Sequence, residues 1–336
     1  MIKEENMNTQ YTPPYQITDE MLILVSQIAE KAGKIQTFHN LSAKPQLRRD
    51  NRIRSIHSSL AIEANSLSID QVKAVLDGHS VLGPAKEIQE VQNAYEAYDQ
   101  IPVIDPYSLN DLKKIHGIMT HLTVNESGTF RRGGVGVFDG DRCIFMAPPA
   151  DMVPKLMADL FQWMKRTEGK IHPLILSSVF HYAFVFIHPF ADGNGRMARL
   201  WQTVLLYQWK EIFQYVPLES QIRNFQSGYY DAIAACNAQG QSTLFITFML
   251  NRINEILEDV ETEAAAPPEP LTAPLKKLLS VMDPGETYSA VELMHLVGLR
   301  AMRSFRAHYL KPALAQGLIT MTLPDKPTSR NQRYRR

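Results

Sequence analysis

The sequence predicts a mostly α-helical protein with one β-hairpin and a small helix–turn–helix module near the C-terminus. Three observations predict this class. Apolar residues recur at helical spacing through most of the chain before residue 261. A glycine-rich stretch with two short β-prone runs interrupts that pattern between residues 128 and 146. A segment rich in Ala, Pro and Glu at 261–274 then separates off the remainder, as a linker does.

The N-terminal third of the chain is expected to form helices at 18–38, 48–65, 68–76 and 85–100. In the first, Leu22, Val25 and Ile28 recur at the spacing that puts apolar residues on one helix face. Ser68 suits the N-cap of the third helix, and Asp77-Gly78 ends it. A connection with two prolines follows at 101–107.

The middle of the chain is expected to hold a helix at 108–121, a hairpin, and then further helices. The hairpin is predicted because two β-prone runs flank Asp139-Gly140. The segment 173–187 is apolar nearly all round and should be a central buried helix. The other helices are expected at 151–165, from the end of a loop at 188–194 to 209, at 227–238 and at 243–260.

Beyond the linker, helices are expected at 275–282, 289–297 and 300–310, with a turn at Gly298, and a strand at 317–321. A helix–turn–helix followed by a strand resembles a winged helix. We therefore expect an N-terminal helical region at 1–106, a central core at 107–262 and a winged-helix-like domain at 263–336.

Composition excludes several classes of protein. Lys+Arg and Asp+Glu both number 35, so the chain has no overall positive charge of the kind that would favour nucleic-acid binding by the whole protein. Cys143 and Cys236 form neither a disulfide framework nor a zinc pattern, as expected of unpaired thiols in a reducing compartment. The N-terminus lacks an apolar signal segment, and no stretch suits a membrane span. We expect cytoplasmic residence and no membrane partner.

The most informative stretch is 188–199, with the sequence His-Pro-Phe-Ala-Asp-Gly-Asn-Gly-Arg-Met-Ala-Arg. It leaves the end of a buried helix and enters the start of another. Gly193 and Gly195 permit a backbone whose N–H groups point into one concavity, reinforced by the positive end of the helix dipole. The loop therefore predicts an anion-binding nest.

The side chains around this nest suit phosphate chemistry. Arg196 and Arg199 lie three residues apart, so both can reach the same side and bind phosphate oxygens. Asp192 is a hard oxygen ligand of the kind that Mg²⁺ with a polyphosphate needs. His188 is the nearby group that can take a proton near neutral pH. Taken alone, His-Pro at a helix end is more often a structural turn, Asp-Gly-Asn-Gly a loop, and the two arginines a solvated helix face. All of these residues at this fixed spacing are much harder to obtain by accident. It is neither a Walker A nor a Rossmann pattern.

The stretch resembles the Fic motif, H-P-F-x-[DE]-G-N-G-R-x-x-R, at every specified position. The resemblance implies that His188 is the general base, that Asp192 binds Mg²⁺, and that Arg199 holds the γ-phosphate of ATP. The phosphate-binding set that it implies comprises Gly193, Asn194, Gly195, Arg196 and Arg199.

The resemblance extends to two further segments. Residues 128–149 are similar to the family's flap hairpin, which docks the backbone of the target protein beside the catalytic histidine. Tyr229 and Tyr230 resemble residues of the helix that borders the adenine pocket, although paired tyrosines on a helix are commonly core packing.

An inhibitory element is implied by Ser-Leu-Ala-Ile-Glu at 59–63, which fits the family's motif [ST]-x-x-x-E-[GN] except that Ala64 stands at the last position. Ser59 and Glu63 are the implied inhibitory residues. Glu63 on Arg199 would occupy the arginine that a γ-phosphate needs. Without the Fic motif downstream, Glu63 would be read as a solvated helix residue. Ala64 resists the left-handed cap that a glycine takes.

The implied activity is a protein adenylyltransferase, in which a Tyr, Thr or Ser hydroxyl of a protein substrate, or of the chain itself, attacks the α-phosphate of ATP·Mg²⁺ and releases pyrophosphate. AMP removal and transfer of another group stay open, although Gly195 speaks against phosphorylating variants. The alternative of another class is a DNA-binding regulator, because Arg303 and Arg306 help make the winged helix locally basic. Protein docking or homo-oligomerisation is the favoured role of that module.

Overall fold

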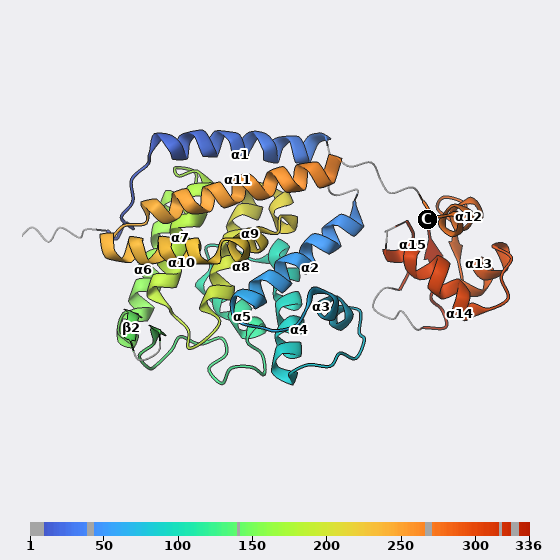
Figure 1. The fold of residues 1–336 in the computed structure, drawn as a ribbon, viewed down its shortest axis with the longest axis horizontal. Coiled ribbons are helices and arrows are strands. Elements are labelled where there is room, and N and C mark those ends of the chain that lie inside the picture. The colour runs from blue at the N-terminus through green and yellow to red at the C-terminus, as the bar shows by residue number, and fades with distance from the viewer. Residues whose placement is uncertain (1–9, 39–43, 140–141, 266–270, 316–317, 324–328) are drawn as a thin grey trace, which may run out of the picture. The chain divides into compact units, whose positions relative to one another are not determined.

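The computed structural model describes residues 10–38, 44–139, 142–265, 271–315, 318–323 and 329–336 (Figure 1). The chain forms two compact units. The larger comprises Met1–Gln36 and Asn51–Glu261, and the smaller comprises Thr37–Asp50 and Thr262–Arg336. The described residues are mostly helical, which confirms the predicted fold class. Within them, no helix combines the length and the apolar character needed to cross a membrane.

The N-terminal helices are α1 (Asp19–Phe38), α2 (Pro45–Ile62), α3 (Ile69–Leu76) and α4 (Ala85–Asp99). In the larger unit α1 runs beside α11 (Thr243–Ala265), as Figure 1 shows, and Lys31 Nζ donates to Asn254 Oδ1 at 2.8 Å. Ser68 caps α3 as predicted, in a capping box with Gln71.

The centre of the larger unit is a pair of packed helices, α7 (Pro173–Ile187) and α8 (Asn194–Trp209). Nearly all of α7 is buried, as its apolar sequence predicted, and Phe180, Phe184 and Trp201 are fully buried between these helices and their neighbours. The elements that complete this unit are η2 (Ile101–Val103), α5 (Leu109–Met119), η3 (Ala150–Met152), α6 (Val153–Thr167), η4 (Glu211–Tyr215), α9 (Leu218–Asn224) and α10 (Gln226–Gln239).

The predicted hairpin is present as β1 (Gly136–Asp139) and β2 (Arg142–Met146), which pair antiparallel with Gly136 opposite Met146. Gly140 of the predicted turn lies outside the described residues, as does the side chain of Cys143. The other cysteine, Cys236, is a buried free thiol.

Several boundaries differ from prediction. Helix α2 ends at Ile62 rather than at 65, because Ala64 takes a left-handed conformation with φ of 65°. Helix α11 continues to Ala265, into the predicted linker, because Glu, Thr and Ala can extend a helix until the prolines that follow. The elements η4 and α9 were not predicted, since their few apolar residues are too short a run to show a period.

The smaller unit has its own core, in which Leu278, Leu293 and Phe305 are fully buried. Its elements are α12 (Ala273–Ser280), β3 (Thr287–Tyr288), α13 (Ala290–Leu296), α14 (Met302–Phe305), a π-helical turn η5 (Arg306–Leu310), α15 (Lys311–Ala315), β4 (Thr320–Met321) and β5 (Tyr334–Arg335). The strands form an antiparallel sheet in the order β3-β5-β4. Helices combined with a small antiparallel sheet agree with the predicted helix–turn–helix and strand, and the assignment as a winged helix stays a prediction. Strands β3 and β5 were not predicted, because each has two residues, too few to show the alternation of apolar and polar side chains that marks a strand.

Candidate active site

His188 ends α7 in a left-handed conformation, with φ of 51° and ψ of 60°. Its backbone N–H donates to Phe184 O, and its Nδ1 lies 3.2 Å from Val185 O. A carbonyl can only accept, so Nδ1 carries the ring proton and Nε2 keeps a free lone pair. Burial, and then the charge of Arg131, hold the pKa of His188 below its usual value of 6.5. The imidazole is therefore neutral near pH 7, as a general base must be.

The loop after His188 is closed by a buried amide. Asn194 Oδ1 accepts from Phe190 N at 2.9 Å, and Asn194 Nδ2 donates to Phe190 O at 2.8 Å. Gly193 begins α8 with φ of 82°, a conformation that favours glycine. The predicted nest residues therefore start the helix through a loop whose path is fixed by side-chain contacts.

His116 of α5 also holds this loop, and sequence reasoning missed it. Gly128 N donates to His116 Nδ1 at 2.9 Å, so the ring donates from Nε2 to Asp192 O, 3.0 Å away. The ring stacks on Phe190 with centroids 3.6 Å apart. Burial lowers the pKa of His116 to about 4, so the ring stays neutral. A lone histidine on an amphipathic helix gives no sequence signal for such a role.

Arg131 fastens the segment before β1 to the loop that follows α7. Its Nε donates to His188 O at 2.7 Å, its Nη1 to Gly133 O at 2.9 Å, and its backbone N–H to Pro189 O at 2.9 Å. This buried guanidinium therefore sets the distance between hairpin and histidine. A hollow between them is lined by Val135, Gly136, Phe145, Ala147 and His188.

Arg199 is almost fully buried and is held by the two predicted inhibitory residues. Its Nη2 lies 2.7 Å from Glu63 Oε1 and 2.9 Å from Ser59 O, while Nε donates to Ser59 Oγ at 3.1 Å. Burial alone would lower the pKa of Arg199, but Glu63 and neighbouring groups outweigh it and the pKa is raised. The structure thus brings Ser59, Glu63 and Arg199 together across 136 or more positions of sequence.

Gly195 lies directly under this contact. A Cβ at Gly195 would overlap Glu63 Oε1 and lie 3.1 Å from Arg199 Nη1. Only glycine therefore fits here while Glu63 occupies Arg199.

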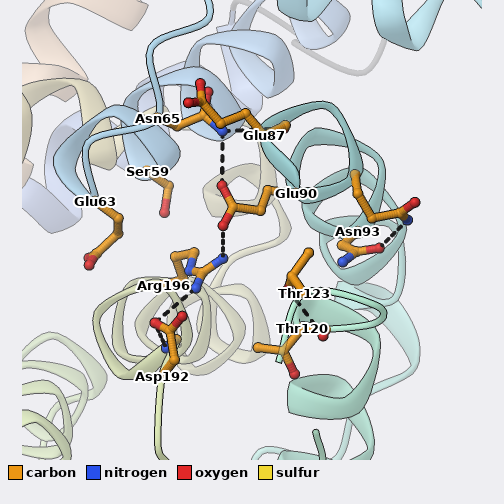
Figure 2. A network of polar contacts seen from close by, with 12 residues as sticks. Ser59, Glu63, Asn65, Glu87, Glu90, Asn93, Thr120, Thr123, Asp192 and Arg196 are labelled. Carbon is orange, nitrogen blue, oxygen red and sulfur yellow. Dashed lines mark hydrogen bonds and ion pairs between the residues drawn. The ribbon is translucent and has the colours of Figure 1, made fainter. Parts of the chain in front are cut away.

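Arg196 is the second arginine of the loop and is 3% exposed. Its Nη2 lies 3.1 Å from Asp192 Oδ1 and its Nη1 lies 3.5 Å from Glu90 Oε1, as Figure 2 shows. Its Nε and Nη1 make no hydrogen bond to any described residue. Buried donors without an acceptor are expected where a ligand supplies one, and an anion suits a guanidinium.

Asp192 fits a metal that arrives with a polyphosphate. Its side chain is 46% exposed. Among the described residues, no group of three or more His, Cys, Asp or Glu could hold a metal ion unaided. Mg²⁺ usually keeps several waters and takes one or two carboxylates together with substrate phosphates. One accessible carboxylate beside Arg196 matches that mode of binding.

The two predicted adenine-pocket tyrosines differ in exposure. Tyr229 is 2% exposed, and its hydroxyl lies 2.9 Å from His181 Nε2 in the core. Tyr230 is 48% exposed, and its ring lies edge-on to that of Tyr229 with centroids 5.3 Å apart. Of the two, Tyr230 is the one exposed enough to contact a ligand, and both assignments stay predictions from the resemblance.

The C-terminal end of α2, just after Glu63, carries a Schellman-type cap. Asn65 N donates to Leu60 O and Ala64 N to Ala61 O, both at 3.1 Å. This motif places Ala64 in the left-handed region, where a Cβ is unfavourable and glycine is the usual residue. Helix α2, which carries Ser59, is therefore followed by a strained residue.

We expect Ala64→Gly to raise the free energy of unfolding by about 0.5–1 kcal/mol, because glycine takes this conformation without strain. Denaturant unfolding monitored by circular dichroism measures it. Ala61→Gly, in the helix itself, is the matched control and should lower stability by about 0.5–1 kcal/mol. A loss of stability in the Ala64→Gly protein would contradict the cap.

Fold and geometry together define a helical protein in which a basic loop site lies beside a neutral histidine. Residues 106–206 match the family model of the Fic/DOC family. Residues 273–336 match the Filamentation induced by cAMP protein Fic-like, C-terminal domain. A Fic family protein from Desulfovibrio desulfuricans G20, solved by crystallography, is 44% identical, with a TM-score of 0.75 over 97% of this chain and 98% of that one. The chain belongs to the Fic family.

More distant relatives agree with this assignment. A protein adenylyltransferase Fic of Culex quinquefasciatus is 28% identical over 69% of this chain and 46% of its own length. Its counterpart in Nematostella vectensis is 26% identical over 70% of this chain and 54% of its own length. The chain therefore spans about half the length of the curated relatives it matches. Fic-1 of C. elegans, at 20% identity and a TM-score of 0.60, shares the fold.

Proposed function

We propose that this chain is a protein adenylyltransferase, which moves AMP from ATP to a Tyr, Thr or Ser hydroxyl of a protein. The observation that carries the proposal is the position of His188, which lines the hollow beside β1 and β2 and whose Nδ1 contact with Val185 O leaves Nε2 with a lone pair. Beside it in the loop lies Arg196, with buried donors that lack an acceptor. The names of the relatives support the same reaction.

In this reaction the substrate hydroxyl gives its proton to His188 Nε2 while its oxygen bonds to the α-phosphorus. The bond from that phosphorus to the bridging oxygen breaks, and pyrophosphate leaves. Arg199 binds the γ-phosphate, while Arg196 and the N–H groups at Gly193–Gly195 bind the phosphates nearer the reacting atom. Asp192 would hold Mg²⁺, which neutralises phosphate charge when bound. The exposed ring of Tyr230 stacks on the adenine.

The resting chain is autoinhibited in this proposal. Glu63 occupies a donor of Arg199 that the γ-phosphate needs, and its negative charge repels that phosphate. Ser59 holds the same guanidinium from its other side. ATP therefore binds the resting chain without its terminal phosphate in place, and transfer is slow until the glutamate leaves.

The chemistry is tested by incubating the Glu63→Gly protein with Mg²⁺ and ATP labelled at either the α- or the γ-phosphorus. Retention of the α label and loss of the γ label on the protein support adenylyl transfer. Retention of the γ label would instead identify phosphate transfer. A chain that adds neither label but releases AMP from a previously adenylylated protein would be an AMP-removing enzyme.

A second candidate function is DNA binding by the smaller unit, and the charge distribution favours it. Residues 273–336 hold 11 Lys and Arg against 4 Asp and Glu, a difference of +7 that the zero net charge of the whole chain conceals. Arg300, Arg303 and Arg306 are exposed, and none forms an ion pair with a described residue. Such an imbalance is typical of nucleic-acid contacts.

We expect the full chain to bind duplex DNA with an affinity that falls steeply with salt. The double change Arg303→Ala with Arg306→Ala should reduce the salt slope by about 2 and weaken binding by more than about tenfold. Lys276→Ala with Lys277→Ala, on α12, removes equal charge from another helix and should have less effect. Equal loss in both pairs, or no binding at low salt, would reject a DNA-binding face and favour protein docking.

A further inference from the structure

Glu90 of α4 bridges the inhibitory segment and the catalytic loop, as Figure 2 shows. Its Oε1 lies 3.5 Å from Arg196 Nη1, and its Oε2 accepts from Asn65 Nδ2 at 3.0 Å. Asn65 follows Glu63 by two residues. Glu90 belongs to neither motif, yet it contacts Arg196 within the motif at 188–199 and Asn65, which follows the segment 59–63.

Arg196 has two carboxylates near it, and they differ in their surroundings. Asp192 has a side chain that is 46% exposed, whereas that of Glu90 is 12% exposed. If Asp192 binds Mg²⁺, its charge is shared with the metal and less is left for the arginine. A buried guanidinium without a counter-charge is strongly unfavourable. Among the described residues, Glu90 is then the protein carboxylate that still faces Arg196.

The orientation of Glu90 is fixed by the end of α2. Besides Glu90, Asn65 Nδ2 donates to Glu87 O at 3.2 Å, and Asn65 Oδ1 accepts from Leu67 N at 3.2 Å. Ser66 adds two bonds to Glu87 Oε2, at 2.6 and 2.7 Å. The amide of Asn65 therefore holds one oxygen of Glu90 and leaves the other beside Arg196.

We propose that Glu90 is a positioning residue, the lasting counter-ion that keeps the Arg196 guanidinium aligned while Asp192 binds the metal. This inference rests on the proposed function. Loss of the Glu90 charge loosens Arg196, which weakens its hold on phosphate, but it also removes a repulsion that phosphates feel. In nucleotide binding the looser arginine and the lost repulsion act in opposite directions, so the Kd changes little. In the reaction, Arg196 is no longer aligned with the phosphates, so kcat falls.

The kinetic test uses Glu90→Gln in the Glu63→Gly protein, since glutamine keeps the size and the contact with Asn65. We expect kcat to fall about tenfold while the Kd for ATP·Mg²⁺, measured by calorimetry, changes less than about threefold. Glu87→Gln is the matched control, because Glu87 lies on the same helix and binds Ser66 but not Arg196. Its kcat should stay within about twofold. An unchanged kcat in Glu90→Gln, or an equal loss in both variants, overturns the proposal.

A second measurement is independent of activity. In the nucleotide-free protein, Glu90→Gln should lower the thermal unfolding midpoint by about 5 °C, because among the described residues the buried Arg196 guanidinium then keeps only the half-exposed Asp192 as a counter-ion. In an Arg196→Met background the same change should lower the midpoint by less than about 2 °C. Equal shifts in both backgrounds overturn the pairing. If the pairing holds but Glu63→Gly transfers no AMP, the proposed function fails and the counter-ion role stands.

Discussion

The Glu63→Gly protein is expected to transfer AMP about 10–100 times faster than the wild-type chain. Glu63 Oε1 lies 2.7 Å from Arg199 Nη2, on a guanidinium that is almost fully buried. A hydrogen bond to a charged group contributes about 1.5–3 kcal/mol. Each 1.4 kcal/mol changes an equilibrium about tenfold. Loss of this hydrogen bond should therefore raise the fraction of chains with Arg199 open to a γ-phosphate by about 10–100 times. Initial rates of AMP incorporation at saturating ATP measure the change.

Two comparisons separate this cause from a general loosening of α2. Glu63→Gln keeps the side-chain length and loses only the charge, so its rate should lie between those of wild type and Glu63→Gly. Ala61→Gly loosens the same helix but leaves the carboxylate, and should leave the rate near that of wild type. A Glu63→Gly protein that is folded, binds ATP and is no faster than wild type would reject the inhibitory role.

His188→Ala, made in the Glu63→Gly protein, is expected to lower kcat by about 10²–10⁴. Among the described residues, the side chain contacts Val185 O through Nδ1, so Nε2 keeps the lone pair that would take the proton of the attacking hydroxyl. The phosphate-binding groups lie elsewhere in the loop, so the Kd for ATP should change less than about threefold. Single-turnover rates and calorimetry on the same preparation give both values.

His116→Ala is the informative contrast to His188→Ala. His116 holds Asp192 O and stacks on Phe190, so its loss should disturb the loop and weaken ATP binding and transfer together. If His188→Ala also loses ATP binding, His188 is a structural residue and the proton must go to another group.

The parts of the site that lie close together in sequence were predictable from sequence. Residues 188–199 form one loop and the first turns of one helix, so their spacing alone places His188, Asp192 and Arg199 on neighbouring backbone. The helices were predictable for the same reason, because amphipathic spacing and caps such as Ser68 act within a few residues. The contact between Glu63 and Arg199 could be anticipated only through the family motif.

The supporting contacts were not predictable, because they join distant elements through buried polar groups. Glu90, His116 and Arg131 come from α4, α5 and the segment before β1, and all converge on the loop at 188–196. A single polar residue on an amphipathic helix has no pattern that distinguishes such a role from a solvated position. By contrast, the basic character of the smaller unit was visible in the sequence around Arg303 and Arg306, although the whole chain has zero net charge.

The most direct test of the central claim is the intact mass of three proteins after incubation with ATP and Mg²⁺. They are wild type, Glu63→Gly, and Glu63→Gly with His188→Ala, each supplied with the same protein substrates. We expect the mass of an adenylyl group on proteins in the Glu63→Gly reaction, little in the wild-type reaction and none with the double variant. Equal adenylylation by wild type and Glu63→Gly, or adenylylation that persists without His188, would contradict the account.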